Sequence, residues 1–335
     1  MDLSGLPPQI ISWVSNLAWL LIISFGFSLL ARFHWAFDLF SHFTIQYIVG
    51  GFALGILLLL MHQYWLAGLC VLVMISSVIE TRWLMQDPLL FTRPDAEANF
   101  KVMHYNKFFT NESPKIRQWM QENGADVDVL IVQESGYDNI EFLKQLSDIF
   151  PNQFPQNQSE SFNDISVLSR YPFQITSIPL ADSSDVSWFT SAATRIEINK
   201  PGVPPVVIYS FHTAVPMGKT YSTHRNGTLK GLAAAVAKEQ SDYVIASGDW
   251  NITPYSPYFS DFVKSSGLHY QNYRLLPETT WAAPFLLPFL KIPIDHVLYN
   301  DKLTLTDIRR GPAMGSDHHA LIASFAVPDK DLNKE

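Results

Sequence analysis

Cysteine is almost absent from this sequence: Cys70 is the one cysteine among 335 residues. An internal disulfide is therefore impossible, and a small fold held together by disulfides is excluded. Charged residues are also scarce, at 16%, whereas 47% of the residues are hydrophobic, and this balance excludes collagen-like and disordered chains. Because Cys70 lies within an apolar run, we expect a buried structural thiol.

Basic residues are outnumbered, with 23 Lys and Arg against 31 Asp and Glu, which gives a formal net charge of −8. Tight, sequence-independent binding of nucleic acid relies on basic side chains that displace counterions from phosphates, so this balance opposes it. It does not exclude a nuclease that meets its substrate briefly around a metal ion. The sequence also has no internal repeat, no low-complexity tract and neither the CxxC nor the HExxH pattern of zinc sites.

The first part of the chain is nearly neutral and largely apolar. Its apolar stretches are 10–30, 43–61 and the shorter 66–79, which approach the length of about 20 residues that a helix needs to cross a bilayer. Aromatic residues cluster near the edges of these stretches, as in interfacial belts: Trp13, Trp19, Trp35, Tyr47, Tyr64, Trp65 and Trp83. We therefore predict a transmembrane region at 1–91 with about three helices, and disfavour both a buried helical core and a cleaved signal peptide.

The orientation of these spans is weakly specified. Arg32 lies between the first two spans, and the connection 62–65 has no Lys or Arg. The positive-inside rule then places the C-terminal part in the cytoplasm.

The remaining residues are predicted to form a polar linker at 92–99, a domain at 100–327 and a polar tail at 328–335. Short β-rich runs recur at 100–105, 129–133, 165–169, 206–211, 243–247, 294–299 and 319–326. Helix signals lie between them, with starts expected at Ser113-Pro114 and at Asn226. This alternation predicts an α/β domain.

Polar residues stand next to the ends of these strands. Those that follow a strand are Asn106, Glu134, His212, Asp249 and Asn251. Those at the beginnings of the last two strands are Asp295, Asp317 and His318. If the last two strands run antiparallel to the earlier ones, all of these side chains gather at one edge of the sheet.

Such a group has a defined chemistry. Carboxylate and amide oxygens suit a hard cation such as Mg²⁺, which also favours phosphate oxygens. An imidazole opposite a carboxylate suits proton transfer near neutral pH. Adjacent residues of a strand point to opposite faces, so at most one of His318 and His319 serves the shared site.

These residues stand in short motifs whose order carries a family resemblance. The motifs are Tyr105-Asn106, Gln133-Glu134, Ser169-Arg170-Tyr171-Pro172, His212-Thr213, Gly248-Asp249-Trp250-Asn251, Ile294-Asp295-His296 and Ser316-Asp317-His318. Over about residues 100–327 the chain resembles the endonuclease/exonuclease/phosphatase superfamily, and its N-terminal spans resemble the membrane-anchored bacterial branch. The resemblance implies a four-layered α/β sandwich of two mixed sheets flanked by helices, preceded by about three transmembrane helices. It also implies hydrolysis of a phosphodiester or phosphomonoester with Mg²⁺ or Mn²⁺.

The resemblance assigns metal binding to three of these residues. Glu134 is the expected principal ligand, Asn106 helps to arrange the metal and the substrate phosphate, and Asp317 contributes from the closing strand.

The resemblance assigns catalytic roles to the others. Asp249 orients or deprotonates the attacking water, and Asn251 fixes the phosphate. His318 contacts the phosphate and transfers a proton while Asp295 holds its ring. His212 stabilises the phosphate or assists the leaving group.

Four further features have predicted roles. We expect His296 to pack in the core, Arg170 to be structural and Asn163 to be a possible partner of His212. The uncharged run 281–290, which contains two prolines, is either a loop packed on the domain or an apolar lip that touches lipid.

The sequence thus predicts a membrane-anchored, metal-dependent phosphoesterase. A nuclease acting on DNA or RNA is the alternative enzyme, and a membrane scaffold or sensor with a disused hydrolase domain is the alternative of another class. The expected partners are the lipid bilayer and a phosphate ester, which is a lipid headgroup, a nucleic acid or a small molecule; no protein partner can be inferred. The resemblance implies a multi-pass protein of a bacterial inner membrane with an extracytoplasmic catalytic domain, against the indication from Arg32.

Overall fold

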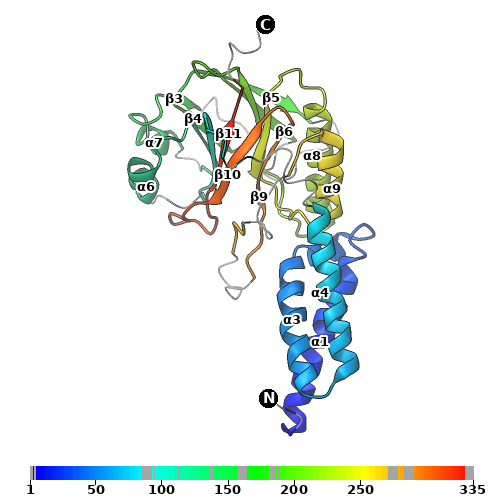
Figure 1. Cartoon of the computed structure of the whole chain (residues 1–335). Coiled ribbons are helices and arrows are strands. Elements are labelled where there is room, and N and C mark those ends of the chain that lie inside the picture. Colours follow the sequence, from blue (N-terminus) through cyan, green and yellow to red (C-terminus); the bar gives the residue numbers. More distant parts are fainter. Residues whose placement is uncertain are drawn as a thin grey trace.

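The structure, a computed structural model, describes residues 3, 5–84, 93, 95–109, 111, 114–135, 139–156, 164–180, 186, 189, 191–270, 278–282 and 290–328, with backbone only for 82–84 and 139. Within these described residues, four helices come first and extend away from a β-rich domain (Figure 1). They are α1 (Pro8–Ser28), α2 (Trp35–Ser41), α3 (Thr44–Leu60) and α4 (Tyr64–Leu84).

These helices have the length and composition of membrane spans. Pro8–Ser28 and Tyr64–Thr81 are each long and apolar enough to cross a membrane. Helices α2 and α3 meet at an angle of 60° and make a third candidate span if the bent pair is counted as one. Only 11% of the apolar stretch of α1 is buried inside the protein, and the side chains of Trp13 and Leu20 are largely exposed. Such apolar surface suits lipid rather than water. Cys70 is buried among the helices, as expected.

The β-rich domain contains two mixed sheets. The first sheet has the order β10-β11-β1-β2-β4-β3, with bounds β1 (Phe100–Asn106), β2 (Val129–Gln133), β3 (Asn152–Phe154), β4 (Ile165–Ser169), β10 (Thr304–Arg310) and β11 (Leu321–Ala326). The second has the order β5-β6-β7-β8-β9, with bounds β5 (Phe173–Pro179), β6 (Ala192–Ile198), β7 (Val206–Ser210), β8 (Val244–Asp249) and β9 (Asp295–Tyr299). The parallel pairs are β1–β2 and β7–β8.

The two sheets pack face to face with helices outside them. Their shared core includes Val102 and Ile131 of the first sheet and Ile208 and Ile245 of the second. Helices α6 (Lys115–Asn123) and α7 (Asn139–Lys144) cover the outer face of the first sheet. Helices α8 (Lys219–Val236) and α9 (Pro257–Ser266) cover the second. The expected four-layered α/β sandwich is confirmed.

The closing strands run in the direction that a shared edge requires. Strand β11 pairs antiparallel with β1, and β9 pairs antiparallel with β8, where Asp295 stands opposite Asp249. The starts of β9 and β11 therefore lie beside the ends of β8 and β1.

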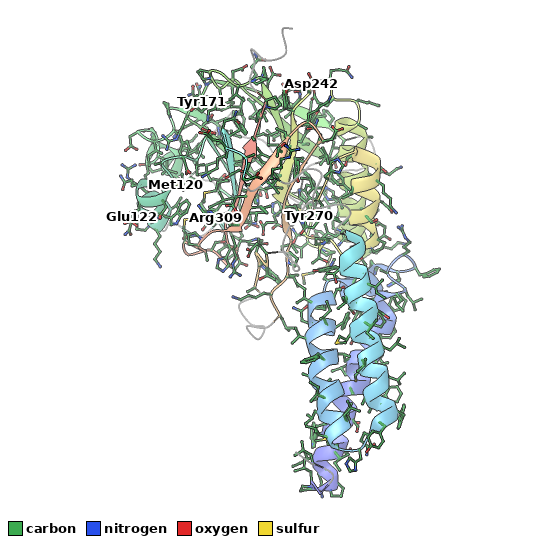
Figure 2. All side chains as sticks on the ribbon, viewed as in Figure 1. Met120, Glu122, Tyr171, Asp242, Tyr270 and Arg309 are labelled. Carbon is green, nitrogen blue, oxygen red and sulfur yellow. The ribbon has the colours of Figure 1, made fainter. Side chains whose placement is uncertain are left out.

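This edge faces the N-terminal helices. Asp242, just before β8, lies at the end of the domain away from the helices, whereas Tyr270 lies at the end near them (Figure 2). The residues that follow β8 contact the helices directly: Thr253 Oγ1 lies 3.0 Å from Nδ1 of His42.

Some elements differ from the sequence predictions. Strands β3, β5, β6 and β10 were not predicted, and edge strand β5 alternates between exposed and half-buried residues, so it has no continuous apolar run. The helix start expected at Asn226 is wrong, because α8 begins at Lys219 with Gly218 at its N-cap. Helix α6 begins after Pro114, and Ser113 lies outside the described residues.

Candidate active site

Gln133 ties the two sheets together at the edge where the candidate residues meet. Its side chain is fully buried; Nε2 donates to the carbonyl of Phe211 at 2.7 Å and Oε1 accepts from the backbone N–H of Asp249 at 2.7 Å. A Cβ at Gly248 would lie 2.2 Å from the Phe211 carbonyl oxygen, so only glycine fits this close approach. The position of Asp249 is therefore fixed by both sheets.

Glu134 and Asp249 lie on either side of one amide. Asn106 Nδ2 is 3.0 Å from Glu134 Oε1 and 3.1 Å from Asp249 Oδ2. Glu134 has a left-handed backbone with φ of 50°, and Asn251 has one with φ of 47°. Such conformations cost about 1–3 kcal/mol for a non-glycine residue and occur often at functional sites.

Two histidine–carboxylate pairs converge on Asp249. On one side, His318 Nδ1 lies 2.9 Å from Asp295 Oδ2, and its Nε2 lies 3.6 Å from Asp249 Oδ2. Burial favours the neutral ring, but the charges of Asp295 and Asp249 outweigh it and raise the pKa of His318 to about 10. The two carboxylates therefore favour the imidazolium form of His318.

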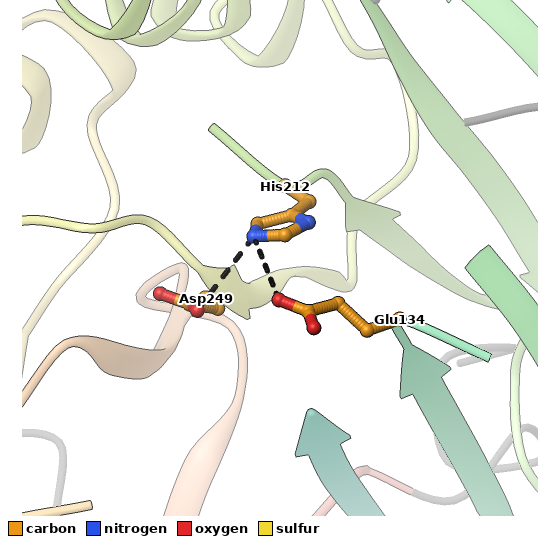
Figure 3. A group of neighbouring side chains, drawn as sticks. All are labelled: Glu134, His212 and Asp249. Atoms are coloured by element: carbon orange, nitrogen blue, oxygen red, sulfur yellow. Dashed lines mark ion pairs between the residues drawn. The ribbon is translucent and has the colours of Figure 1, made fainter. Parts of the chain in front are cut away.

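On the other side, His212 Nδ1 lies 3.1 Å from Asp164 Oδ2. Its Nε2 lies 3.7 Å from Asp249 Oδ2 and 3.8 Å from Glu134 Oε1 (Figure 3). Burial again opposes protonation, but the charge and hydrogen bond of Asp164, with the charges of Asp249 and Glu134, raise the pKa of His212 to about 9.

The two central carboxyls are shifted in opposite directions. Burial raises the pKa of Asp249, and the charge of Asp295 adds to this, against the effects of His318 and His212. Burial also opposes the ionisation of Asp295, but His318 and His104 outweigh it and hold its pKa well below the usual range. The His104 contact, Nε2 to Asp295 Oδ1 at 3.0 Å, reaches across from β1. Asp249 is thus the more basic carboxylate of the two.

Asn251 lies beside His212. Its Nδ2 donates to the carbonyl of Thr213 at 2.9 Å and lies 3.5 Å from His212 Nε2. Its backbone N–H donates to Asp249 Oδ1 at 3.0 Å, and its carbonyl accepts from Nη1 of Arg225 at 3.4 Å. These contacts hold the Asn251 amide at the site.

Asp317 lies at the margin. Its Oδ2 accepts from Nε1 of Trp281 at 3.0 Å, and among the described residues it belongs to neither close group of metal-binding side chains. Its neighbour Ser316 links the start of β11 to the end of β1, donating to the carbonyl of Asn106 at 2.8 Å.

The donor set fits a divalent cation. Glu134, His212 and Asp249 form one group in which the possible ligand atoms lie within 4.8 Å of one another, and Asp249, Asp295 and His318 form a second. The hard carboxylate oxygens of Glu134 and Asp249 suit Mg²⁺ or Mn²⁺. The Asn106 oxygen accepts from the backbone N–H of Phe108 at 3.0 Å, so this amide presents its nitrogen to the carboxylates and would offer oxygen to a metal only if it turned.

Three residues of the site were not predicted from the sequence. Gln133 links the two sheets, His104 contacts Asp295, and Asp164 contacts His212. Asn163, the residue expected to hold His212, lies outside the described residues, and its neighbour Asp164 makes that contact. Asp164 could have been predicted, because its carboxylate is next to Asn163 in the sequence and a carboxylate is a stronger partner for an imidazole than an amide. His104 is itself buried, in a strand whose residues are nearly all buried, and gave no comparable signal.

Two structural expectations are borne out. His296 is fully buried, packs against Trp250 and bonds the carbonyl of Ile252 at 2.7 Å. Arg170 Nε donates to the carbonyl of Val127 at 2.8 Å. Most of the apolar run 281–290 lies outside the described residues.

The family model of the endonuclease/exonuclease/phosphatase family matches residues 106–318, from the first of these side chains to the last. The chain belongs to this family. Its members are hydrolases that act on ester bonds, and the enzyme class expected from the sequence is confirmed. No curated protein sequence matches the chain.

Solved structures agree on the fold. Sphingomyelinase C from Streptomyces griseocarneus is 16% identical with a TM-score of 0.50, covering 68% of this chain and 99% of its own. An endonuclease/exonuclease/phosphatase from Beutenbergia cavernae is 15% identical with a TM-score of 0.53, covering 69% and 72%. The human nocturnin catalytic domain with bound sulfate is 19% identical with a TM-score of 0.51, covering 71% and 96%. The likeness to a membrane-anchored branch stays a prediction.

Proposed function

We propose that this protein is a membrane-anchored phosphoesterase that uses Mg²⁺ or Mn²⁺ to hydrolyse a phosphodiester or phosphomonoester by attack of water. The observation that carries the proposal is the position of Asp249, which lies beside Glu134 and between two histidines that are each held by a carboxylate. Attack on phosphorus builds negative charge on its oxygens, and preorganised cations stabilise that charge more in the transition state than in the ground state.

The proposed metal ligands are those of the sequence analysis. Glu134 is the principal ligand. Asn106, whose amide contacts the Glu134 carboxylate, helps to arrange the metal and the substrate phosphate, and Asp317 contributes from the loop before β11. A bound Mg²⁺ or Mn²⁺ supplies a Lewis acid that polarises the phosphoryl group.

The remaining residues move protons and hold the phosphate. Asp249 accepts a proton from the attacking water, and its raised pKa makes it a better base than an ordinary aspartate. The His318 imidazolium, held by Asp295, donates to the phosphate or the departing oxygen. His212 supplies a second positive charge, and Asn251 fixes a phosphate oxygen.

The N-terminal helices support the proposed anchoring in a bilayer. Arg32, between α1 and α2, binds Asp261 of α9, so it lies on the side of the membrane that holds the β-rich domain. The positive-inside rule then favours a cytoplasmic domain, whereas the resemblance to anchored bacterial proteins favours an extracytoplasmic one, which we adopt. Protease accessibility in intact cells and in spheroplasts distinguishes them: cleavage of the domain in intact cells or spheroplasts supports our placement, and cleavage only after lysis contradicts it.

The test of activity uses the purified full chain with and without Mg²⁺ or Mn²⁺. DNA, RNA, sphingomyelin and inositol phosphates form the substrate panel. Metal-dependent hydrolysis of a lipid or small phosphate ester supports the proposal. Activity confined to DNA or RNA supports the nuclease alternative, and no hydrolysis with any metal supports a scaffold.

A further inference from the structure

A cavity lies between the N-terminal helices and α9, and none of the proposed catalytic or metal-binding residues lines it. Its volume is about 420 Å³, within the range of small-molecule sites. One wall comes from the helices, with Ser28 at the end of α1 and Glu80 on α4, and the other comes from 254–270 of the β-rich domain. Tyr270, on that second wall, lies at the end of the domain near α4 (Figure 2).

The cavity carries charges of both signs. Arg32 and Lys264 line one part of it, and Arg32 donates through Nη1 and Nη2 to Asp261, both at 2.8 Å. A hydrogen bond from Arg32 lowers the pKa of Asp261, and the charge of Lys264 lowers it further. Glu80 also lines the cavity, with Thr44 Oγ1 at 3.5 Å from Oε2. Asp261, which is not part of the lining, balances the charge of Arg32, so Lys264 and Glu80 leave the wall with one charge of each sign. Such a cavity suits a ligand that itself carries one charge of each sign.

An unpartnered hydroxyl stands in the wall. Tyr255 is 4% exposed, lines the cavity and has no hydrogen-bond partner for its hydroxyl among the described residues. Burial raises the pKa of Tyr255, and the charges of Tyr270 and Glu80 add to this, so it stays a neutral donor. Burying a hydroxyl without a partner is costly, and a ligand oxygen would remove that cost.

The depth of the cavity relative to the proposed bilayer indicates the class of ligand. Ser28 ends the apolar helix α1, and Glu80 lies at the end of the apolar window Tyr64–Thr81. Since a bilayer-spanning helix carries its ends at the lipid headgroups, the cavity lies at headgroup level. We propose that it binds the headgroup of a zwitterionic phospholipid, with the phosphate toward Arg32, Lys264 and the Tyr255 hydroxyl, and the ammonium toward Glu80. This inference rests on the membrane anchoring proposed above.

Lipid binding to the purified full chain in detergent, with divalent metal chelated, tests the site by native mass spectrometry. The probes are phosphatidylethanolamine, phosphatidylglycerol and soluble glycerophosphoethanolamine. We expect phosphatidylethanolamine to bind at one per chain, about tenfold more tightly than phosphatidylglycerol, since a hydrogen bond or contact with a charged group is worth roughly that factor. We expect the soluble headgroup to bind more weakly than the lipid, because the acyl chains also contact the helices.

Tyr255→Phe is the sharpest variant, because it removes only the hydroxyl and retains the buried ring. It should weaken phosphatidylethanolamine binding about tenfold, as should Arg32→Ala combined with Lys264→Ala. Arg117→Ala is the matched control, since Arg117 of α6 forms a similar exposed pair with Asp148. Equal binding of the two lipids, or Tyr255→Phe with unchanged affinity, overturns the site.

The anchoring is tested separately by flotation with phosphatidylcholine vesicles. A chain that floats with vesicles and hydrolyses a phosphate ester but shows no lipid preference contradicts this cavity alone. A chain that does not float contradicts the anchoring.

Discussion

Asp38 of α2 and Arg225 of α8 form an ion pair in which both side chains are buried, and the pair joins the N-terminal helices to the β-rich domain. Ser256 Oγ also donates to Asp38, at 2.7 Å. Arg225 donates in turn to the carbonyl of Asn251, at 3.4 Å. The helical segment therefore supports the loop that carries a proposed phosphate-binding residue.

Asp38→Ala should destabilise the protein by about 3–5 kcal/mol, because it leaves the buried charge of Arg225 without an opposite charge beside it. The measurement is thermal unfolding of the full chain in detergent. Arg117→Ala, which breaks an exposed pair, should leave the midpoint unchanged. Equal midpoints for Asp38→Ala and the unmodified protein would show that the pair does not stabilise the interface.

His318→Asn should lower kcat by about 10² to 10⁴ even at saturating metal, because it removes the proposed proton donor. His319→Asn is the matched control, since this neighbouring ring bonds the carbonyl of Gly311 at 3.0 Å instead. Steady-state hydrolysis of a phosphate ester measures both. Similar losses in the two variants would remove His318 from the chemistry.

The stability of the metal-free protein should fall as pH rises from about 7 to 10. The pKa values of His212 and His318 are raised from 6.5 to about 9 and about 10. A group whose pKa is raised by folding contributes stability that is complete below its unfolded pKa and lost as pH passes its folded pKa. Unfolding midpoints of the chelated full chain should therefore decline over this window, and less steeply in His212→Asn combined with His318→Asn. If the unfolding midpoints of the double variant and of the unmodified chain fell equally steeply with pH, the raised pKa values of His212 and His318 would be contradicted.

Within the described part of the β-rich domain, the large apolar side chains that are exposed are Phe108, Phe109, Val215 and Met217. They follow Asn106 and Thr213 in two loops at the edge that faces the helices. Contact of such side chains with a bilayer would help the site to reach a lipid phosphate.

Phe109→Ser combined with Met217→Ser should therefore lower hydrolysis of a phosphate ester embedded in vesicles several-fold and leave a soluble ester unaffected. Phe33→Ser removes another exposed apolar side chain near the bilayer but outside these two loops, since Phe33 is 81% exposed between α1 and α2, and so controls for a general loss of membrane contact. A parallel loss on both substrates would exclude a role in reaching the bilayer.

The sequence was most informative where a candidate site residue lies next to a strand. Asn106 ends β1, Glu134 follows β2 and Asp249 ends β8, so strand ends located these residues before any geometry was known. The antiparallel closing strands then brought Asp295 and His318 to the same edge, as expected. Asp317 lies at the margin of the site, where its carboxylate accepts a hydrogen bond from the indole N–H of Trp281.

The partners that hold these residues could not be predicted in the same way. Asp164 and His212 are 48 positions apart, and Asp38 and Arg225 are 187 apart, so nothing local in the sequence marks either pair. The edge strand β5 was missed for a different reason. Its side chains alternate between half-buried and exposed, a pattern that a search for continuous apolar runs does not detect.

The central claim is that Glu134 and its neighbours hold a divalent ion against a phosphoryl group. The most direct test follows phosphate-ester hydrolysis by the unmodified chain and by Glu134→Ala while Mg²⁺ or Mn²⁺ is titrated. We expect the unmodified chain to saturate with metal, and the variant to require far more metal or to stay about 10²-fold slower throughout. Undiminished activity of Glu134→Ala across the titration would contradict the account.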